Sequence, residues 1–285
     1  MLFSPTLKII LTVIFACDII VYIWLGIGAE VMNIKIGAQM MTVREHCKTT
    51  SDFFGSMKKV AEIGYSCVQI SMIGEGITAA EIREAGDKYG LEVPLTHTNP
   101  IKIRDNTDIV IADHKKMGAK YVGIGSMPDW NGVYGGVDGA ARFVADYRPV
   151  AQKLRDKGLM LMYHNHSFEY MKLGGKLLMD ILIDGIPEMG VTLDVYWVAH
   201  GGADPAAWIR KLTGRIDCIH YKDMMMQGTT QKMCEVMEGN LNWPAIFAAS
   251  KEAGVKYAFV EQDDCNGKDP FECLATSFNN IKKNM

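Results

Sequence analysis

The stretch "GLMLMYHNHSFEY", residues 158–170, runs from a glycine through four apolar residues into a cluster of histidines, an asparagine and a glutamate. A run of this kind is typical of a buried strand whose carboxyl end carries polar side chains. The preceding segment, residues 140–158, has apolar residues at the spacing of a helix and closes on Gly158, which suits a left-handed C-cap. Helix, strand and polar loop therefore follow one another here.

The same unit recurs along the chain. Short apolar runs alternate with amphipathic stretches, which predicts parallel strands joined by helices. Eight strands are expected, at 34–39, 67–71, 92–97, 121–125, 159–165, 190–195, 216–222 and 257–262. Eight repeats in about 250 residues favour an α/β fold of the (β/α)8 TIM-barrel type over a doubly wound sheet. We expect a single catalytic domain over residues 32–285.

The composition excludes some classes of partner. A formal net charge of −3 gives no basic surface for a phosphate backbone, so we expect no nucleic-acid partner. The seven cysteines are scattered and form no CxxC pair, which indicates reduced thiols and a cytoplasmic protein. A small molecule is the expected ligand, and a homo-oligomer is compatible with the sequence.

The hydrophobic segment over residues 1–31 does not fit the repeat. Residues 9–29 are about long enough to cross a bilayer, but Asp18 interrupts them at a cost of about 3 kcal/mol. Either the segment is an N-terminal anchor, which would make the protein membrane-anchored, or Met32 is the natural start. Both interpretations stay open.

Polar residues gather at the expected strand ends, which meet at one mouth of a TIM barrel. Four of them follow successive strands, namely Glu169, Asp194, His220 and Glu261. Three carboxylates and an imidazole suit one divalent cation such as Mn²⁺, Mg²⁺, Co²⁺ or Zn²⁺. Without a cation the carboxylates would repel one another, so we expect either a metal, at a site that stays open to substrate, or strongly raised carboxyl pKa values.

Five motifs together resemble one family. They are "YHNHSFEY" (163–170), "TLDVYWVAHGGADP" (192–205), "GRIDCIHYKDM" (214–224), "EGNLNWPAIF" (238–247) and "FVEQDDC" with "DPFECLATSF" (259–278). In this order they resemble the sugar phosphate isomerase/epimerase family of xylose-isomerase-like barrels, in its Tyr-His-Asn-His branch. The resemblance implies one divalent metal held by a glutamate, an aspartate, a histidine and a second glutamate, with the glutamates also transferring protons. Asp194, His220 and Glu261 match those positions.

The ligand after the fifth strand departs from the family pattern, because His164 stands where many relatives have a glutamate. Glu169 lies five residues further on. Either the loop folds back so that Glu169 is the ligand, which we expect, or His164 binds the metal and Glu169 contacts substrate. The alternation of a strand places His164 and His166 on one face.

The expected roles in catalysis follow from this arrangement. Glu169, Glu261 and His166 are the expected catalytic residues. A second set of residues is expected to contact substrate, namely His97, His164, Trp197, Lys222 and Trp130. For each aromatic residue, packing on the rim of the barrel is the alternative.

The expected function is a metal-dependent sugar or sugar-phosphate isomerase or epimerase that works through an enediolate. Two alternatives stay open. The same enolising site could serve a lyase or hydrolase of 3-keto-glycosides, or the barrel could bind a sugar without converting it. A zinc phosphodiesterase acting on DNA is disfavoured, since such an enzyme needs more ligands and a basic groove.

Overall fold

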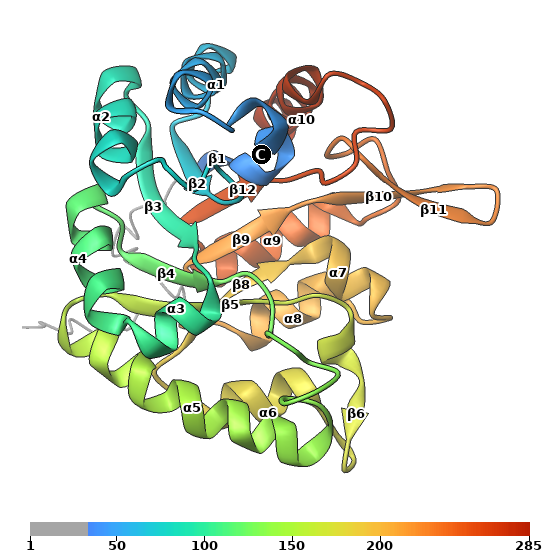
Figure 1. Ribbon diagram of the computed structural model, residues 1–285. Coiled ribbons are helices and arrows are strands. Elements are labelled where there is room, and N and C mark those ends of the chain that lie inside the picture. The colour runs from blue at the N-terminus through green and yellow to red at the C-terminus, as the bar shows by residue number, and fades with distance from the viewer. Residues whose placement is uncertain (1–33) are drawn as a thin grey trace, which may run out of the picture. The chain divides into compact units, whose positions relative to one another are not determined.

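The computed structural model of the protein describes residues 34–285, and in this part of the chain eight parallel strands close into a barrel (Figure 1). The strands are β1 (Lys35–Gln39), β2 (Cys67–Ile70), β3 (Glu92–His97), β4 (Tyr121–Ile124), β5 (Met160–His164), β8 (Gly190–Asp194), β9 (Cys218–Tyr221) and β12 (Tyr257–Val260). They follow one another round the barrel in sequence order, and β12 closes on β1. The predicted TIM barrel and its eight strands are confirmed.

Helices surround the barrel on its outer side (Figure 1). The α-helices are α1 (Thr50–Ile63), α2 (Ala79–Tyr89), α3 (Pro100–Asp105), α4 (Thr107–Met117), α5 (Gly136–Asp156), α6 (Leu178–Gly185), α7 (Val195–His200), α8 (Pro205–Lys211), α9 (Trp243–Glu252) and α10 (Pro270–Asn284), and two 3-10 helices are η1 (Met40–His46) and η2 (Phe168–Tyr170). Asp204 and Asp269 cap α8 and α10, each with a proline in the first turn, as the sequence predicts.

Two apolar layers hold the fold together. Inside the barrel, a small cluster that includes Leu95, Met162 and Phe259 is fully buried. A much larger cluster lies between the outer faces of the strands and the helices. Successive residues of a strand point to opposite faces, so every strand contributes to both layers and reads as an almost continuous apolar run.

Two short hairpins interrupt the alternation of barrel strands and helices along the chain. They are β6 (Lys172–Leu173) with β7 (Lys176–Leu177), and β10 (Asp223–Gln227) with β11 (Thr230–Cys234). The second projects away from the barrel (Figure 1). The carboxylate of Asp223 fixes the loop beyond it by accepting hydrogen bonds from the backbone nitrogens of Met237 and Gly239 and from the indole of Trp243 (2.8, 3.0 and 2.6 Å).

The N-terminal segment over residues 1–31, with both interpretations given to it, lies outside the described residues. Within residues 34–285, no helix has the length and apolar character needed to cross a membrane.

Gly123 in β4 tests the packing of the barrel wall. A methyl group at this position would overlap the carbonyl oxygen of Thr96 in β3 and approach the ring of His97 to 3.1 Å. A backbone carbonyl cannot move aside as a flexible side chain can. Gly123→Ala should therefore lower the free energy of unfolding by about 1–3 kcal/mol in urea denaturation.

The matched control for that substitution is Gly55→Ala. Gly55 is exposed in α1 and has no neighbour within 4 Å of an added methyl group. Alanine should stabilise the helix there by about 1 kcal/mol. Equal effects of the two substitutions would contradict the close approach of β3 and β4.

Candidate metal centre

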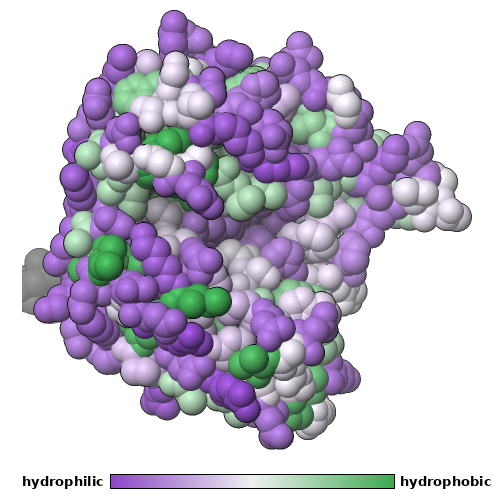
Figure 2. Space-filling view, in the orientation of Figure 1, coloured by the Kyte–Doolittle hydropathy of each residue, from purple (hydrophilic) through white to green (hydrophobic). Residues whose placement is uncertain are grey.

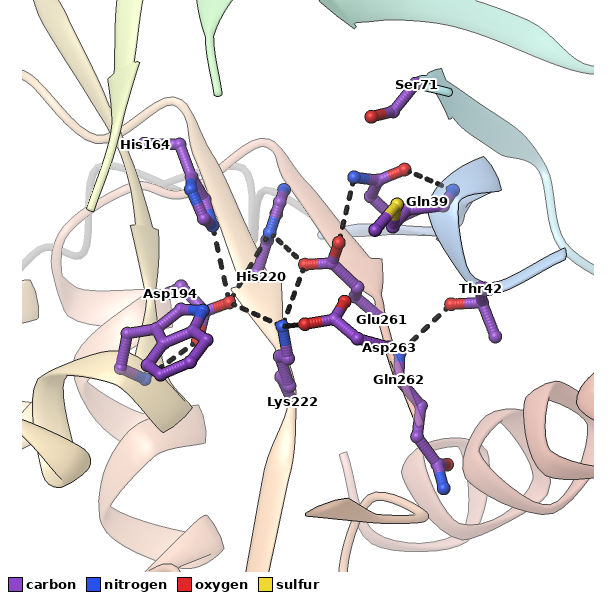
Figure 3. A network of polar contacts seen from close by, with 12 residues as sticks. Gln39, Thr42, Ser71, His164, Asp194, His220, Lys222, Glu261, Gln262 and Asp263 are labelled. Atoms are coloured by element: carbon purple, nitrogen blue, oxygen red, sulfur yellow. Dashed lines mark hydrogen bonds and ion pairs between the residues drawn. The ribbon is translucent and has the colours of Figure 1, made fainter. Parts of the chain in front are cut away.

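Four buried side chains converge at the carboxyl ends of the strands (Figure 3). His164 ends β5, Asp194 ends β8, His220 lies in β9 and Glu261 follows β12. Each residue offers one ligand atom, and these atoms all lie within 4.8 Å of one another. The strand register brings them together, because Asp194 lies opposite His220, and His220 lies opposite Phe259, two residues before Glu261.

The ring of His164 is oriented by the backbone of the neighbouring strand's loop. Its Nδ1 donates to the carbonyl oxygen of Gly125 at 2.9 Å. With the proton on Nδ1, the neutral ring has a lone pair on Nε2. That atom faces Oδ2 of Asp194 at 3.4 Å.

The ring of His220 is held in the same manner from inside the barrel. Its Nε2 donates to Oε1 of Gln69 in β2 at 2.6 Å. Nδ1 therefore carries the lone pair of the neutral ring, and it lies 2.8 Å from Oε2 of Glu261 and 3.7 Å from Oδ2 of Asp194. His220 Nδ1 and Glu261 Oε2 are both buried without hydrogen-bond geometry to any partner in the described chain.

The carboxylates favour positive charge at this point. Burial opposes the ionisation of Asp194 and Glu261, but nearby Lys222 and the imidazoles outweigh it and hold the pKa of both carboxyls below the usual range. Burial likewise disfavours a charged His220, yet the carboxylates of Glu261 and Asp194 raise its pKa to about 9. A proton on Nδ1 and a metal cation would therefore compete for one place.

The donor set fits a divalent cation. Two imidazole nitrogens and two carboxylate oxygens are a common mixed set for such ions, and each histidine has its other ring nitrogen fixed by an oxygen acceptor, as metal-bound histidines almost always do. Lone pairs on His164 and His220 that face carboxylates repel them unless a cation lies between. These four residues could therefore hold one metal ion.

Asn165 fixes the backbone of one of these residues. Its Oδ1 accepts from the backbone nitrogen of Asp194 at 2.9 Å, and its Nδ2 donates to the carbonyl oxygen of Asp194 at 3.3 Å. Oδ1 of Asp194 also accepts from the backbone nitrogen of Trp197 at 3.1 Å and caps α7. Oδ2 of Asp194 is thereby left to face the other ligand atoms.

Glu169 does not belong to the group of four, although we expected it as the ligand after β5. Its carboxylate is fully buried and accepts from the hydroxyl of Tyr163 at 2.7 Å and from the backbone nitrogen of His166 at 2.8 Å. The short 3-10 helix η2 turns it toward Tyr163, on the outer face of β5. The structure brings His164 into the group in its place.

Lys222 lies beside the four residues and is also buried. Its Nζ donates to Oδ2 of Asp263 at 2.6 Å and lies 3.5 Å from Glu261 and 3.7 Å from Asp194. Asp223, the next residue in the sequence, is not its partner. The structure assigns its closest carboxylate to Asp263, because Asp223 turns away to the loop beyond β10.

A cavity of about 580 Å³ opens above the four residues, and Figure 2 shows this face hollowed near its centre. His97, His164, His166, Trp197 and Lys222, which were expected to contact substrate or to be catalytic, all line it. Nε2 of His97 and Nδ1 of His166 are buried without a hydrogen-bond partner within residues 34–285.

Trp130 is not among the residues that line this cavity. Its ring stacks on Phe168, with centroids 4.5 Å apart, and is 37% exposed. Its position agrees with the alternative of packing on the rim.

Two glutamines complete the surroundings of the ligand atoms. No role was predicted for Gln69 from the sequence. A polar residue within the apolar run "CVQIS" could have indicated a function inside the barrel, and here it accepts the hydrogen bond from His220. Gln39 ends β1, and its Nε2 donates to Oε1 of Glu261 at 3.0 Å. Both amides orient a ligand side chain.

Comparison with known proteins agrees with this architecture. Residues 57–272 match the family described as the xylose isomerase-like TIM barrel. No curated protein matches the chain.

Solved structures with the same fold include several enzymes of sugars. A sugar phosphate isomerase/epimerase from Parabacteroides distasonis has a TM-score of 0.74 at 20% identity, over 90% of this chain and 96% of that one. An L-ribulose 3-epimerase has a TM-score of 0.70 at 15% identity, over 88% and 94% of the chains. A D-allulose 3-epimerase from Methylomonas sp., in complex with D-allulose, has a TM-score of 0.65 at 16% identity, over 88% and 97%.

The buried carboxyl of Glu169 predicts a pH dependence of stability. Burial raises its pKa to about 7, against 4.5 for an exposed glutamate. The folded protein then binds this proton more tightly than the unfolded chain, so the contribution of Glu169 to stability is fully present below pH 4.5 and is lost as the pH rises to about 7. The loss amounts to as much as about 3 kcal/mol.

Glu169→Gln isolates this effect, because glutamine resembles the protonated carboxyl in shape. The free energy of unfolding should be measured for both proteins between pH 4.5 and 8 with a chelator present. The wild type should lose stability relative to the variant across this window. Parallel curves would show that Glu169 is ionised as readily in the folded protein as in the unfolded chain.

Proposed function

The chain belongs to the xylose isomerase-like TIM-barrel family, and on that premise we propose that it is a metal-dependent isomerase or epimerase of sugars that works by proton transfer. The observation that carries the proposal is the convergence of His164, Asp194, His220 and Glu261 on one point at the floor of the cavity. Such a group at the carboxyl ends of barrel strands is in the place where TIM-barrel enzymes have their active sites.

His164, Asp194, His220 and Glu261 would hold the metal. When bound, a divalent cation acts as a Lewis acid that polarises a sugar carbonyl and makes the neighbouring C–H bond more acidic. Two imidazole ligands favour a transition metal such as Mn²⁺, Co²⁺ or Zn²⁺ over Mg²⁺, which prefers oxygen ligands.

Glu261 is the proposed base that removes the proton. It is ionised, lines the cavity, and is oriented by the amide of Gln39. His166 is the proposed second group, approaching from the β5 side of the barrel. Burial lowers the pKa of His166 to about 3, so its ring is neutral at rest; when negative charge develops on the substrate, the ring takes a proton from water and passes it to the substrate carbon.

Three further side chains are placed to bind the sugar. Lys222 would donate a hydrogen bond to a substrate oxygen that gains negative charge, which stabilises the transition state. His97 has a free ring nitrogen that can bond to a hydroxyl group, and Trp197 offers an apolar face for the sugar ring. The D-allulose bound by a structural neighbour supports a ketose as the kind of substrate.

One observation favours a second candidate function. With Glu169 turned toward Tyr163, Glu261 is the one glutamate among the residues that line the cavity. Elimination from a 3-keto-glycoside needs a single base to remove the proton next to the carbonyl, while the glycosidic bond breaks and the leaving oxygen receives a proton from water, which His166 can relay. The lyase is therefore retained as the alternative.

Deuterium exchange tests the proposal. Ketoses and keto-glycosides would be incubated with the protein and Mn²⁺ in heavy water, and deuterium at the carbon next to the carbonyl would be measured by NMR spectroscopy. Incorporation with an isomerised or epimerised product supports the isomerase, and release of the aglycone supports the lyase. No incorporation from any substrate would overturn proton-transfer chemistry.

Glu261→Gln should reduce the exchange rate by about 10²- to 10⁴-fold, because the base is lost. The control is Glu92→Gln, which alters a carboxylate at the opposite end of β3 that is bonded to Tyr257 and Lys35. Its exchange rate should equal that of the wild type. If Glu169→Gln lost exchange while its fold stayed intact, the second proton-transfer role would belong to Glu169 instead of His166.

A further inference from the structure

The cavity at the mouth contains very little positive charge from side chains. Among the residues of 34–285 that line it, Lys222 is the only lysine or arginine. Proteins that bind a sugar phosphate need cationic side chains, most often arginine, or a row of free backbone N–H groups to compensate the phosphate. Lys222 is therefore the one cationic side chain of this described lining that could compensate a phosphate.

The positive charge of Lys222 is already compensated by carboxylates, so it cannot also neutralise a phosphate dianion, although one N–H group can still bond to a substrate oxygen. Its side chain is 1% exposed, and its ammonium group lies between the carboxylates of Asp263, Glu261 and Asp194, at 2.6, 3.5 and 3.7 Å (Figure 3). The ring of Trp197 covers it further, with the centroid 5.2 Å from Nζ. A phosphate that approached this cation would also meet three negative groups.

Two cationic side chains near the rim of the cavity, Arg44 and Lys102, already have polar partners. Arg44 donates to the carbonyl oxygens of Met41 and Asp263, both at 3.1 Å. Lys102 pairs with Asp113 at 3.2 Å. Neither Arg44 nor Lys102 lines the cavity above the four ligand residues.

The charges of the mouth balance without any charge on the substrate. Asp194, Glu261 and Asp263 carry three negative charges, and Lys222 carries one positive charge. One divalent cation would bring this set to neutrality, whereas a phosphate dianion would leave two buried negative charges without a partner, which is costly.

The rest of the lining suits hydroxyl groups. It contains neutral hydrogen-bonding side chains, namely Gln39, Ser71, Thr98, Asn99 and Ser126. Together with the indole of Trp197, such groups bind a polyhydroxylated ring by hydrogen bonds and by contact with its apolar face.

We propose that the substrate is an uncharged sugar without a phosphate group, selected because the one lysine or arginine that residues 34–285 contribute to the cavity is buried among three carboxylates. This inference rests on the proposed function for the reaction. It names the substrate class for that same site and excludes the phosphorylated form that the sequence left open.

The test compares one ketose with its terminal phosphate ester on the wild-type protein loaded with Mn²⁺. Deuterium incorporation gives kcat/KM, which should be at least about 100-fold higher for the free sugar because the ester places like charges together. Equal or greater kcat/KM for the ester would overturn the inference while leaving the proposed function intact.

Binding provides an independent measurement that does not require turnover. Free sugars, matched polyols and their phosphate esters would be titrated into the loaded protein by calorimetry. Tighter binding of the uncharged member of each pair supports the inference, even if no exchange occurs and the proposed reaction fails. Tighter binding of the esters, or no binding of any uncharged sugar or polyol, would overturn it.

Asp263→Asn tests whether the carboxylates around Lys222 cause the preference for uncharged sugars over phosphate esters. The substitution removes one negative charge and frees an N–H group of Lys222, so the preference for free sugar over ester should narrow by about tenfold or more. The control is Asp180→Asn, which breaks a lysine–aspartate pair of 2.5 Å with Lys211 on the outer helices and should leave the preference unchanged. An unaltered preference in Asp263→Asn would assign the selection to shape instead of charge.

Discussion

Two imidazole rings each turn one nitrogen toward buried carboxylates, and the site depends on this arrangement. Each ring is held by an oxygen acceptor on its far side, the carbonyl of Gly125 for His164 and the amide of Gln69 for His220. Lone pairs that face carboxylates repel unless positive charge lies between them. A cation therefore satisfies all four groups at once.

The barrel fold places these four ligand residues together at the carboxyl ends of its strands. At the amino ends of the strands the charged groups are paired, since Asp217 accepts from Tyr121 and Lys256, at 2.7 and 2.8 Å. At the carboxyl ends Glu261 and His220 instead keep buried atoms without a hydrogen-bond partner in the described chain. The unsatisfied groups of the described barrel thus include those that could bind a metal.

Much of the fold could be predicted from the sequence, because apolar strands of the barrel are buried on both faces and stand out between amphipathic helices. Asp194, His220 and Glu261 could be brought together for the same reason, since each directly ends or follows such a strand. The choice between Glu169 and His164 could not be predicted. It depends on a 3-10 turn of three residues and on the hydroxyl of Tyr163, and a local pattern of polar residues specifies neither.

The supporting residues were harder to predict for a different reason. Gln69 reaches His220 across the barrel and Gln39 reaches Glu261 from the neighbouring strand, at 151 and 222 positions' separation in sequence, so their role becomes visible only when the strands close. The hairpin that begins at Asp223 was not predicted, because its two strands are inserted between β9 and α9 and lie outside the strand–helix repeat.

Anomalous diffraction from crystals grown with Mn²⁺ tests the central claim most directly. The account predicts one peak at the manganese edge, within coordination distance of Nε2 of His164, Oδ2 of Asp194, Nδ1 of His220 and Oε2 of Glu261. A structure with no peak at this point, in which His220 and Glu261 share a proton as an ion pair, would contradict it.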